Sequence, residues 1–376
     1  MTRIDGLRAG LGGALMALAS TAALAQGPAA PTQAFSAAAD RAAIVRVMTA
    51  VADWQLANPS KHEPYDWTQA AFYTGMMAFA GISDTPKYIE AMKAMGERNQ
   101  WRPGPRPGHA DDYAVTATYA QLYQREKNKA MLGPSLALFN FLLTRRFDDP
   151  LVWGNGIENR ELAWCDALFM GPPAMAAVAA ATGDRRYLDL ADRLWWKTTD
   201  YLYDRTEHLY YRDSRYFDQR EKNGRKVFWS RGNGWVIAGL ARLLQDMPPD
   251  FRGRDRYEQL YRDMAGAVLT AQSGDGYWRS SLLDPDSRPN PETSGTGFFV
   301  FSLGWGVKQG LLDRAKYEPA VMKGWDALVR AVQPNGMLGW VQQIGAEPGS
   351  AGADSTEVYG TGAFLLAGTA VHALAK

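Results

Sequence analysis

An aspartate set among apolar residues is the group in this sequence best suited to carrying a proton. Asp166 stands in the segment ELAWCDALFM, close to Trp164, Phe169 and Met170. Burial among such side chains disfavours the ionised carboxylate and raises its pKa, which an acid that delivers a proton near neutral pH requires. The position equally suits a helix-capping aspartate that accepts hydrogen bonds from backbone N–H groups. The residues alone leave both roles open.

A second acidic pair opens the segment HADDYAVTATYAQLY. Asp111 and Asp112 are neighbours, and His109 precedes them. Adjacent residues on a helix point about 100° apart, so the two carboxyls are not expected to face the same ligand. We expect one to cap the helix and the other to face the substrate, with Asp111 preferred as the second catalytic carboxyl. Asp112 and His109 are candidate substrate contacts.

The segment FWSRGNGWV combines an aromatic ring with a cation. Trp229 and Arg231 stand two residues apart, and Gly232 and Gly234 allow the backbone to approach a ligand closely. An indole stacks on a sugar face, and a guanidinium binds a carboxylate through two parallel hydrogen bonds. This pattern favours a sugar that carries a carboxylate, with Trp164 as a further contact. The alternative for Arg231 is a structural arginine bonded to loop carbonyls.

These candidate residues all stand near the starts of predicted helices. Runs of alternating apolar and polar residues are scarce, and most segments follow the helical period, so the fold class is all-α. Six segments low in charge open near Trp67, Asp111, Trp164, Arg231, Thr293 and Glu357. Amphipathic segments precede or separate them, at residues 41–57, 87–99, 128–143, 185–203, 255–271 and 315–332.

Six helices low in charge inside six amphipathic ones predict a single-domain (α/α)6 barrel spanning residues 39–376. Closure of the ring explains why no capping repeats are needed. An irregular bundle of twelve helices is the alternative. Because every inner helix follows a Gly- and aromatic-rich loop, we expect these loops to gather at one mouth and to form the active site there. Glu292 and Glu357 are expected to cap the last two inner helices.

Composition narrows the class of partner. The 376 residues include 41 basic and 40 acidic side chains, a balance that argues against nucleic acid. The 13 Trp and 17 Tyr exceed what a core of this size needs, and flat amphipathic rings stack on sugars. An oligosaccharide is therefore the expected substrate. The sequence gives no basis for predicting an oligomeric state.

The first residues are typical of an export signal. Arg3 and Arg8 precede an apolar run over residues 11–24, and Ala23-Leu24-Ala25 forms a small-x-small cleavage site. The run is too short to span a membrane. We therefore predict a signal peptide at residues 1–25, a disordered stretch at residues 26–38 and a location outside the cytoplasm, most consistent with the periplasm.

Several kinds of chemistry lack their sequence signatures. The four histidines are scattered singly, and Cys165 is the only cysteine, so neither a metal site nor an intramolecular disulfide is predicted. There is no dinucleotide-binding or phosphate-binding glycine motif and no GxSxG elbow. The candidate chemistry that remains is that of carboxylates placed among aromatic residues.

The chain resembles the unsaturated rhamnogalacturonyl hydrolases of glycoside hydrolase family 105. The matching strings are HADDYAVTATYAQLY, AWCDALFMGPP, FWSRGNGWVIAGLARLL and ETSGTGFFVFSLGWGVKQGLLD, in the family's order between Trp67 and the C-terminus. This resemblance implies that Asp166 is the general acid/base and Asp111 the second active-site carboxylate. It places Trp229, Arg231 and Trp235 in the substrate pocket.

One departure from the family concerns the segment 209–213, where several members carry a histidine. This chain has Arg212 in the segment and His208 just before it. The resemblance therefore makes both residues candidate binders of the uronate.

The resemblance implies hydration of a double bond rather than direct displacement at the glycosidic carbon. Asp166 protonates carbon 4 of a 4,5-unsaturated uronate, and water that the resulting carboxylate deprotonates adds to carbon 5. The ring then opens and the next sugar leaves, without a metal or organic cofactor. The implied substrates are pectin-derived oligosaccharides.

Four other functions stay open. A family 88 glucuronyl hydrolase acts on glycosaminoglycan-like fragments by the same hydration. A toroid epimerase needs paired histidines, and a polysaccharide lyase needs a Tyr or Lys/Arg base, neither of which the motifs single out. A periplasmic sugar-binding protein that has lost catalysis is the alternative outside enzymes.

Overall fold

The structure is a computed structural model and describes residues 34–375. The predicted signal peptide and residues 26–33 of the predicted disordered stretch lie outside the described residues. Residues 34–38 are irregular, yet Phe35 and Ala37 pack against the core. Core contacts therefore begin slightly before the predicted boundary at residue 39. None of the helices between residues 34 and 375 is both long enough and apolar enough to cross a bilayer.

Two concentric sets of helices make up the described chain. The inner set is α2 (Trp67–Ala80), α4 (Thr116–Glu126), α6 (Ala167–Met170) with α7 (Pro172–Thr182), α9 (Ser230–Asp246), α11 (Thr293–Lys308) and α13 (Val358–Leu374). The outer set is α1 (Arg41–Ala57), α3 (Lys87–Arg98), α5 (Gly133–Thr144), α8 (Arg186–Leu202), α10 (Arg254–Thr270) and α12 (Arg314–Arg330).

Side-chain composition explains which helices lie inside. Helix α11 is buried at every position from Thr293 to Val307, which its small and apolar residues permit. Helix α8 instead buries one stripe that includes Leu188, Ala191 and Trp195, and it keeps its charged residues outside. A helix that is apolar all round must be covered on every side, whereas an amphipathic helix covers others with one face.

The inner helices form a closed ring. Helix α2 packs against α4, α4 against α7, α7 against α9, α9 against α11, α11 against α13, and α13 returns to α2. The outer helices pack against one or two inner neighbours each, as α12 does against α11 and α13. The predicted (α/α)6 barrel is therefore confirmed.

Close helix contacts in this ring depend on glycine. A Cβ added at Gly75 of α2 would meet the backbone of Gly362 in α13, and one added at Gly362 would meet the carbonyl oxygen of Ala71. Larger residues here would push the first and last inner helices apart. Backbones approach this closely only where a side chain is missing.

The structure departs from the predicted elements in three places. The third inner helix divides at Gly171, because Pro172 and Pro173 lack the N–H groups that would continue the ladder of hydrogen bonds. The second begins as a short 3-10 helix, η1 (Ala110–Tyr113), before α4 starts. A small antiparallel hairpin, not predicted, pairs β1 (Tyr203–Asp204) with β2 (Leu209–Tyr210).

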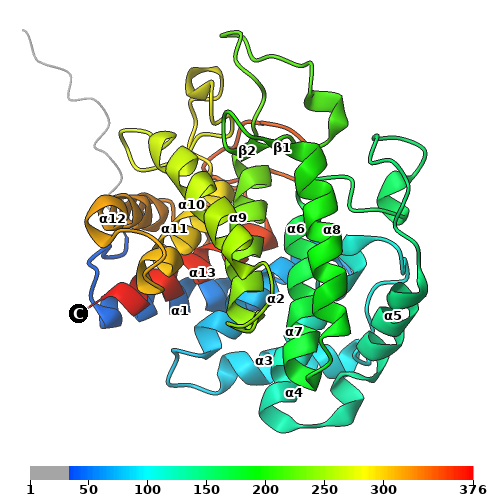
Figure 1. The fold of residues 1–376 in the computed structure, drawn as a ribbon. Coiled ribbons are helices and arrows are strands. Elements are labelled where there is room, and N and C mark those ends of the chain that lie inside the picture. The colour runs from blue at the N-terminus through cyan, green and yellow to red at the C-terminus, as the bar shows by residue number, and fades with distance from the viewer. Residues whose placement is uncertain (1–33, 376) are drawn as a thin grey trace, which may run out of the picture. The chain divides into compact units, whose positions relative to one another are not determined.

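The loops before the inner helices gather at one mouth of the barrel. Figure 1 shows the β1–β2 hairpin together with the loops that lead into α9 and α13 at the top of the view. Glu292 caps α11, as predicted, by accepting hydrogen bonds from the N–H groups of Ser294 (2.9 Å) and Gly295 (2.7 Å). The same prediction is wrong for Glu357, whose side chain makes no capping bond to α13.

The contact between α6 and α9 gives a test of how closely the barrel is packed. A Cβ added at Gly239 of α9 would lie 2.6 Å from the carbonyl oxygen of Leu168 in α6. We expect Gly239→Ala to destabilise the protein by about 1–3 kcal/mol. Activity should also fall, because Asp166 directly precedes α6. Thermal unfolding and a turnover assay measure the two effects.

Gly266→Ala is the matched control. Gly266 lies inside α10, and beyond the local backbone of that helix no heavy atom is within 4 Å of the added Cβ. Helix propensity alone should then stabilise the protein by up to about 1 kcal/mol. Equal changes in melting temperature for the two variants would show that α6 and α9 are not in tight contact.

Candidate active site

Asp166 lies at the start of α6 with 8% of its surface exposed. Its carboxylate makes no capping hydrogen bond, so the capping role left open by the sequence is wrong. Oδ2 lies 3.4 Å from Nε of Arg212, and the Cys165 thiol donates to the same oxygen at 3.7 Å. Burial raises the pKa of Asp166, while Arg212 and Arg231 oppose the rise.

Asp111 faces the same space from η1. Its side chain is 17% exposed, and burial, together with the charge of Asp166, raises its pKa to about 8. His109 orients it: Nδ1 of the imidazole accepts a hydrogen bond from the backbone N–H of Asp111 at 3.3 Å. Burial lowers the pKa of His109 to about 4, so the ring is neutral at neutral pH.

Asp112 points away from Asp111 and fixes a loop. It accepts a hydrogen bond from the backbone N–H of Arg106 at 2.7 Å, and the Arg106 guanidinium pairs with it at 2.6 Å. This agrees with the expectation that only one of the adjacent carboxyls faces the substrate. Asp112 and His109 do not line the cavity, so the geometry gives no support to their predicted role as direct substrate contacts.

A cavity of about 150 Å³ lies between the two acids. This volume is below that of most small-molecule sites and suits one sugar ring better than a chain of them. Most of its wall is indole, guanidinium and carboxyl. Its lining residues are Trp67, Asp111, Trp164, Asp166, Met170, Arg212, Trp229, Arg231, Trp235, Ile344 and Gly345.

Arg212 is the cation closest to Asp166. Nη1 donates to Asp213 at 2.7 Å, and the guanidinium stacks on the Trp153 ring at 4.5 Å. The carbonyl of Arg212 accepts a hydrogen bond from the N–H of Cys165 at 2.8 Å, which ties this segment to the start of α6. Nε is buried and makes no hydrogen bond, and its closest anion is the Asp166 carboxylate at 3.4 Å.

Arg231 is fully buried and largely committed to the protein. Nη1 and Nη2 donate to the carbonyl oxygens of Gln342 (2.6 Å) and Gln343 (2.9 Å). The guanidinium lies between the rings of Trp229 (4.5 Å) and Tyr359 (4.9 Å). The structural alternative for Arg231 is therefore observed. Its bonds hold the loop that contributes Ile344 and Gly345 to the cavity.

Two further predicted residues differ in their placement. Trp235 lines the cavity and meets Trp67 edge to face, with ring centroids 6.0 Å apart. His208 lies in the turn of the β1–β2 hairpin, where Nδ1 pairs with the Tyr203 hydroxyl at 2.9 Å. It does not line the cavity, so the prediction that it contacts the uronate receives no support from the geometry.

Four cavity residues were missed among the sequence candidates. Trp67 and Met170 stand in segments already assigned to inner helices, and a tryptophan at a helix start could have pointed to Trp67. Ile344 and Gly345 lie in a loop without a motif. Nothing in that loop's sequence indicates that Arg231 draws it to the mouth.

Comparison with known proteins identifies the class. The model of Glycosyl Hydrolase Family 88 matches residues 41–375. An unsaturated 3S-rhamnoglycuronyl hydrolase of Formosa agariphila is 41% identical over 85% of this chain and 88% of its own length. The unsaturated rhamnogalacturonyl hydrolase YesR of Bacillus subtilis is 23% identical over 73% and 78%.

Solved structures agree on the fold. A chain described as a polysaccharide lyase matches with a TM-score of 0.80 and 33% identity, covering 89% of this chain and 98% of that one. Structures named as family 105 members match at 18% identity, which establishes the shared fold alone.

The protein is therefore a glycoside hydrolase with a toroid fold. It belongs to Glycosyl Hydrolase Family 88. The family 105 membership expected from the motifs is not directly shown.

The pKa of Asp111 predicts how stability depends on pH. A folded-state pKa of about 8 lies above the ordinary value of 3.8, so the folded protein binds the proton more tightly. The stability associated with protonated Asp111 is complete below pH 3.8 and is lost as pH rises toward 8. Asp111→Asn avoids this loss. The variant should unfold on the order of 2 °C or more above the wild type at pH 8, with a smaller difference at acid pH.

Thermal unfolding across this pH range measures the difference, with the exposed Asp218→Asn as a control. A separation between Asp111→Asn and wild type that is constant with pH would rule out a protonated Asp111 in the folded protein.

Proposed function

We propose that the protein removes a terminal 4,5-unsaturated uronic acid from oligosaccharides in which the next sugar is rhamnose. The observation that supports this most strongly is the cavity between Asp166 and Asp111. It is sized for one ring, walled by indoles, and supplied with a guanidinium next to a buried carboxyl. A cavity of this small volume favours attack on a terminal sugar rather than within a chain.

The double bond explains how one mechanism can act on unsaturated uronates that come from different polysaccharides. Glucuronate and galacturonate differ in configuration at carbon 4, and a bond between carbons 4 and 5 removes that difference. The terminal ring is then the same, and the aglycone and its linkage carry the specificity. Greater similarity to the rhamnoglycuronyl hydrolase than to YesR favours a rhamnoglycuronyl fragment over the pectin fragments first expected.

Proton transfer is assigned to Asp166. The protonated carboxyl delivers its proton to carbon 4, and positive charge develops at carbon 5 and the ring oxygen. The Asp166 carboxylate then takes a proton from the water that adds to carbon 5. The resulting hemiketal opens, and the hemiacetal left at carbon 1 releases the next sugar. Asp111 orients the water or the ring hydroxyls from the opposite side of the cavity.

Arg212 is assigned to the carboxylate of the uronate. Arg212 lines the cavity and commits one terminal nitrogen, Nη1, to Asp213, whereas both terminal nitrogens of Arg231 are bonded to carbonyls. A substrate carboxylate at Arg212 would offset the positive charge that holds the pKa of Asp166 down. Substrate binding would thus favour the protonated acid that the first step needs.

The cavity offers little support for the lyase alternative. A lyase of the kind considered above needs a tyrosine, lysine or arginine as base. Within the described part of the chain, neither tyrosine nor lysine lines this cavity. Its arginines, Arg212 and Arg231, are both engaged in charge or carbonyl contacts.

Replacing the proposed acid tests the central assignment. Asp166→Asn keeps the side-chain shape but cannot transfer the proton, so turnover should fall by about 10² to 10⁴-fold or more. Loss of the ultraviolet absorbance of the enol ether measures turnover. Circular dichroism and the melting temperature check the fold, and Asp218→Asn should keep normal activity.

Two unsaturated disaccharides separate the substrate classes. One carries rhamnose after the uronate, and the other carries an N-acetylated amino sugar, as glycosaminoglycan fragments do. We expect faster turnover of the first. Preference for the second would favour the glucuronyl hydrolase alternative, and normal turnover by Asp166→Asn would remove the proposed mechanism.

The role of Arg212 has a pH signature. Activity requires protonated Asp166 and is lost as pH rises through its pKa. Arg212 lowers that pKa, so Arg212→Gln should move the alkaline limb of kcat/KM to higher pH and also raise KM. Initial rates across pH measure both effects.

Arg215→Gln is the matched control for Arg212. Arg215 also pairs with Asp213 and stacks on Trp153, but it does not line the cavity. Its loss should leave the alkaline limb in place. An unmoved limb in Arg212→Gln, or an equal shift in both variants, would contradict the electrostatic role of Arg212.

A further inference from the structure

A second cavity lies at the other ends of the inner helices. Its volume is about 520 Å³, and it shares no lining residue with the cavity of Asp166. Helix α9 contributes to both cavities, with Arg231 and Trp235 to the first and Arg242 and Gln245 to the second. At about 1.5 Å of rise per residue, Arg231 and Arg242 are roughly 16 Å apart along the helix. The two cavities are therefore separate sites.

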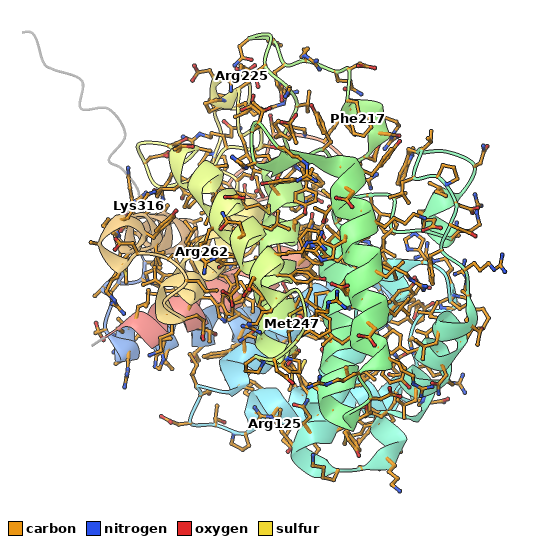
Figure 2. The ribbon with its side chains drawn as sticks, in the orientation of Figure 1. Arg125, Phe217, Arg225, Met247, Arg262 and Lys316 are labelled. Carbon is orange, nitrogen blue, oxygen red and sulfur yellow. The ribbon has the colours of Figure 1, made fainter. Side chains whose placement is uncertain are left out.

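Figure 2 locates this end of the molecule. Arg125, at the end of α4, and Met247, directly after α9, lie in the lower part of the view. Phe217 and Arg225, from the loops near the hairpin, lie at the top. The second cavity is thus at the end of the barrel away from the mouth loops.

The lining of the second cavity is basic and rich in carboxamides. Five inner helices, α2, α4, α9, α11 and α13, contribute to it. Neither aspartate nor glutamate is among its lining residues, so it has no acid for glycoside hydrolysis. The polar and aromatic members are Arg125, Arg242, Lys308, Gln121, Gln124, Gln245, Gln309, Thr74, Thr369, Phe301 and Trp305.

Helix ends account for two of the three cations. Arg125 is in the last turn of α4 and Lys308 in the last turn of α11, where the helix dipole favours positive charge. Arg242 has no such explanation, because it precedes the last turn of α9. It is also 92% buried, given an exposed fraction of 8%.

Arg242 lacks the partner that a buried cation normally has. Its one hydrogen bond runs from Nη1 to the carbonyl oxygen of Phe169 at 3.5 Å, and the guanidinium lies 4.7 Å from the Phe169 ring. Among the described residues, no carboxylate lies within 4.0 Å of it. Asp246, four residues along the same helix, is the acid whose charge acts on Arg242. Burial raises its pKa to about 6 and Arg242 opposes the rise, so it is largely ionised at neutral pH, but it forms no ion pair with Arg242 within 4.0 Å. A buried charge without a paired anion is costly.

We propose that the second cavity binds a small acidic saccharide, with its carboxylate or sulfate paired to Arg242. Arg125 and Lys308 add to the positive field, and the four glutamines offer donors and acceptors for sugar hydroxyls. Phe301 and Trp305 provide aromatic surface. The volume lies in the range of small-molecule sites and admits one or two sugar rings. This site goes beyond the proposed function and does not depend on it.

Calorimetric titration of the complete mature protein tests the site. Sodium glucuronate, sodium sulfate and glucose are the probes. We expect glucuronate to bind at two sites per chain in the wild type and at one in Arg242→Met, with at least a tenfold loss of affinity at the second. Arg212→Gln should weaken the other site instead. That pattern separates this proposal from the proposed function, whose failure would leave the Arg242-dependent site intact.

Three results would overturn the proposal. The first is a single glucuronate site whose affinity Arg242→Met does not change. The second is sulfate binding as tight as that of glucuronate. The third is binding of glucose, which lacks the acid group, as tightly as glucuronate. The exposed Lys316→Met, on outer helix α12 and labelled in Figure 2, is the matched control and should leave both sites unchanged.

The fold of Arg242→Met is checked independently. Removal of an unpaired buried charge should leave the melting temperature without ligand unchanged or higher, and hydrolytic activity should be unchanged. If the variant is instead destabilised, the double variant Arg125→Gln and Lys308→Gln supplies the test. It leaves Arg242 in place but should still weaken glucuronate at the second site at least threefold, and unchanged affinity would overturn the proposal.

Discussion

The structure depends on closing a ring of buried helices. Helices α11 and α13 are apolar on nearly every side, so a gap in the ring would expose faces that the rest of the barrel is built to cover. Closure is made where α13 meets α2, at Gly75 and Gly362. Gln55 of α1 accepts a hydrogen bond from Thr361 of α13 at 2.9 Å, which ties the beginning of the described chain to its end.

The same closure assembles the active site. Asp111, Asp166 and Arg231 stand at three different helix starts, and Ile344 comes from the loop before α13. None of these segments could form a cavity alone. Arg231 links two of them, because its guanidinium donates to the carbonyls of the loop that carries Ile344. A residue suited to binding substrate thus has a structural role in building the wall of the cavity.

The buried charged groups of the active site have different electrostatic roles. Two carboxyls and two guanidinium groups share one small space, and burial favours protonation of both acids. Both guanidinium groups lower the pKa of Asp166, and Arg212, at 3.4 Å, has the larger effect. The proposed substrate brings one more negative charge next to Arg212. Its binding therefore favours the protonated form of Asp166, which a proton donor requires.

Local sequence determined the helices, because periodicity and charge decide whether a helix is buried all round or on one face. It also singled out Asp166, Asp111 and the indoles, whose chemistry is readable one residue at a time. It did not distinguish the cap from the acid at Asp166, nor the ligand-binding from the structural role of Arg231. Those depend on hydrogen-bond partners such as Gln342, which lies 111 residues away from Arg231 in the chain. Only the closed barrel brings such partners together, and it alone shows that Arg242 is buried without an ion pair.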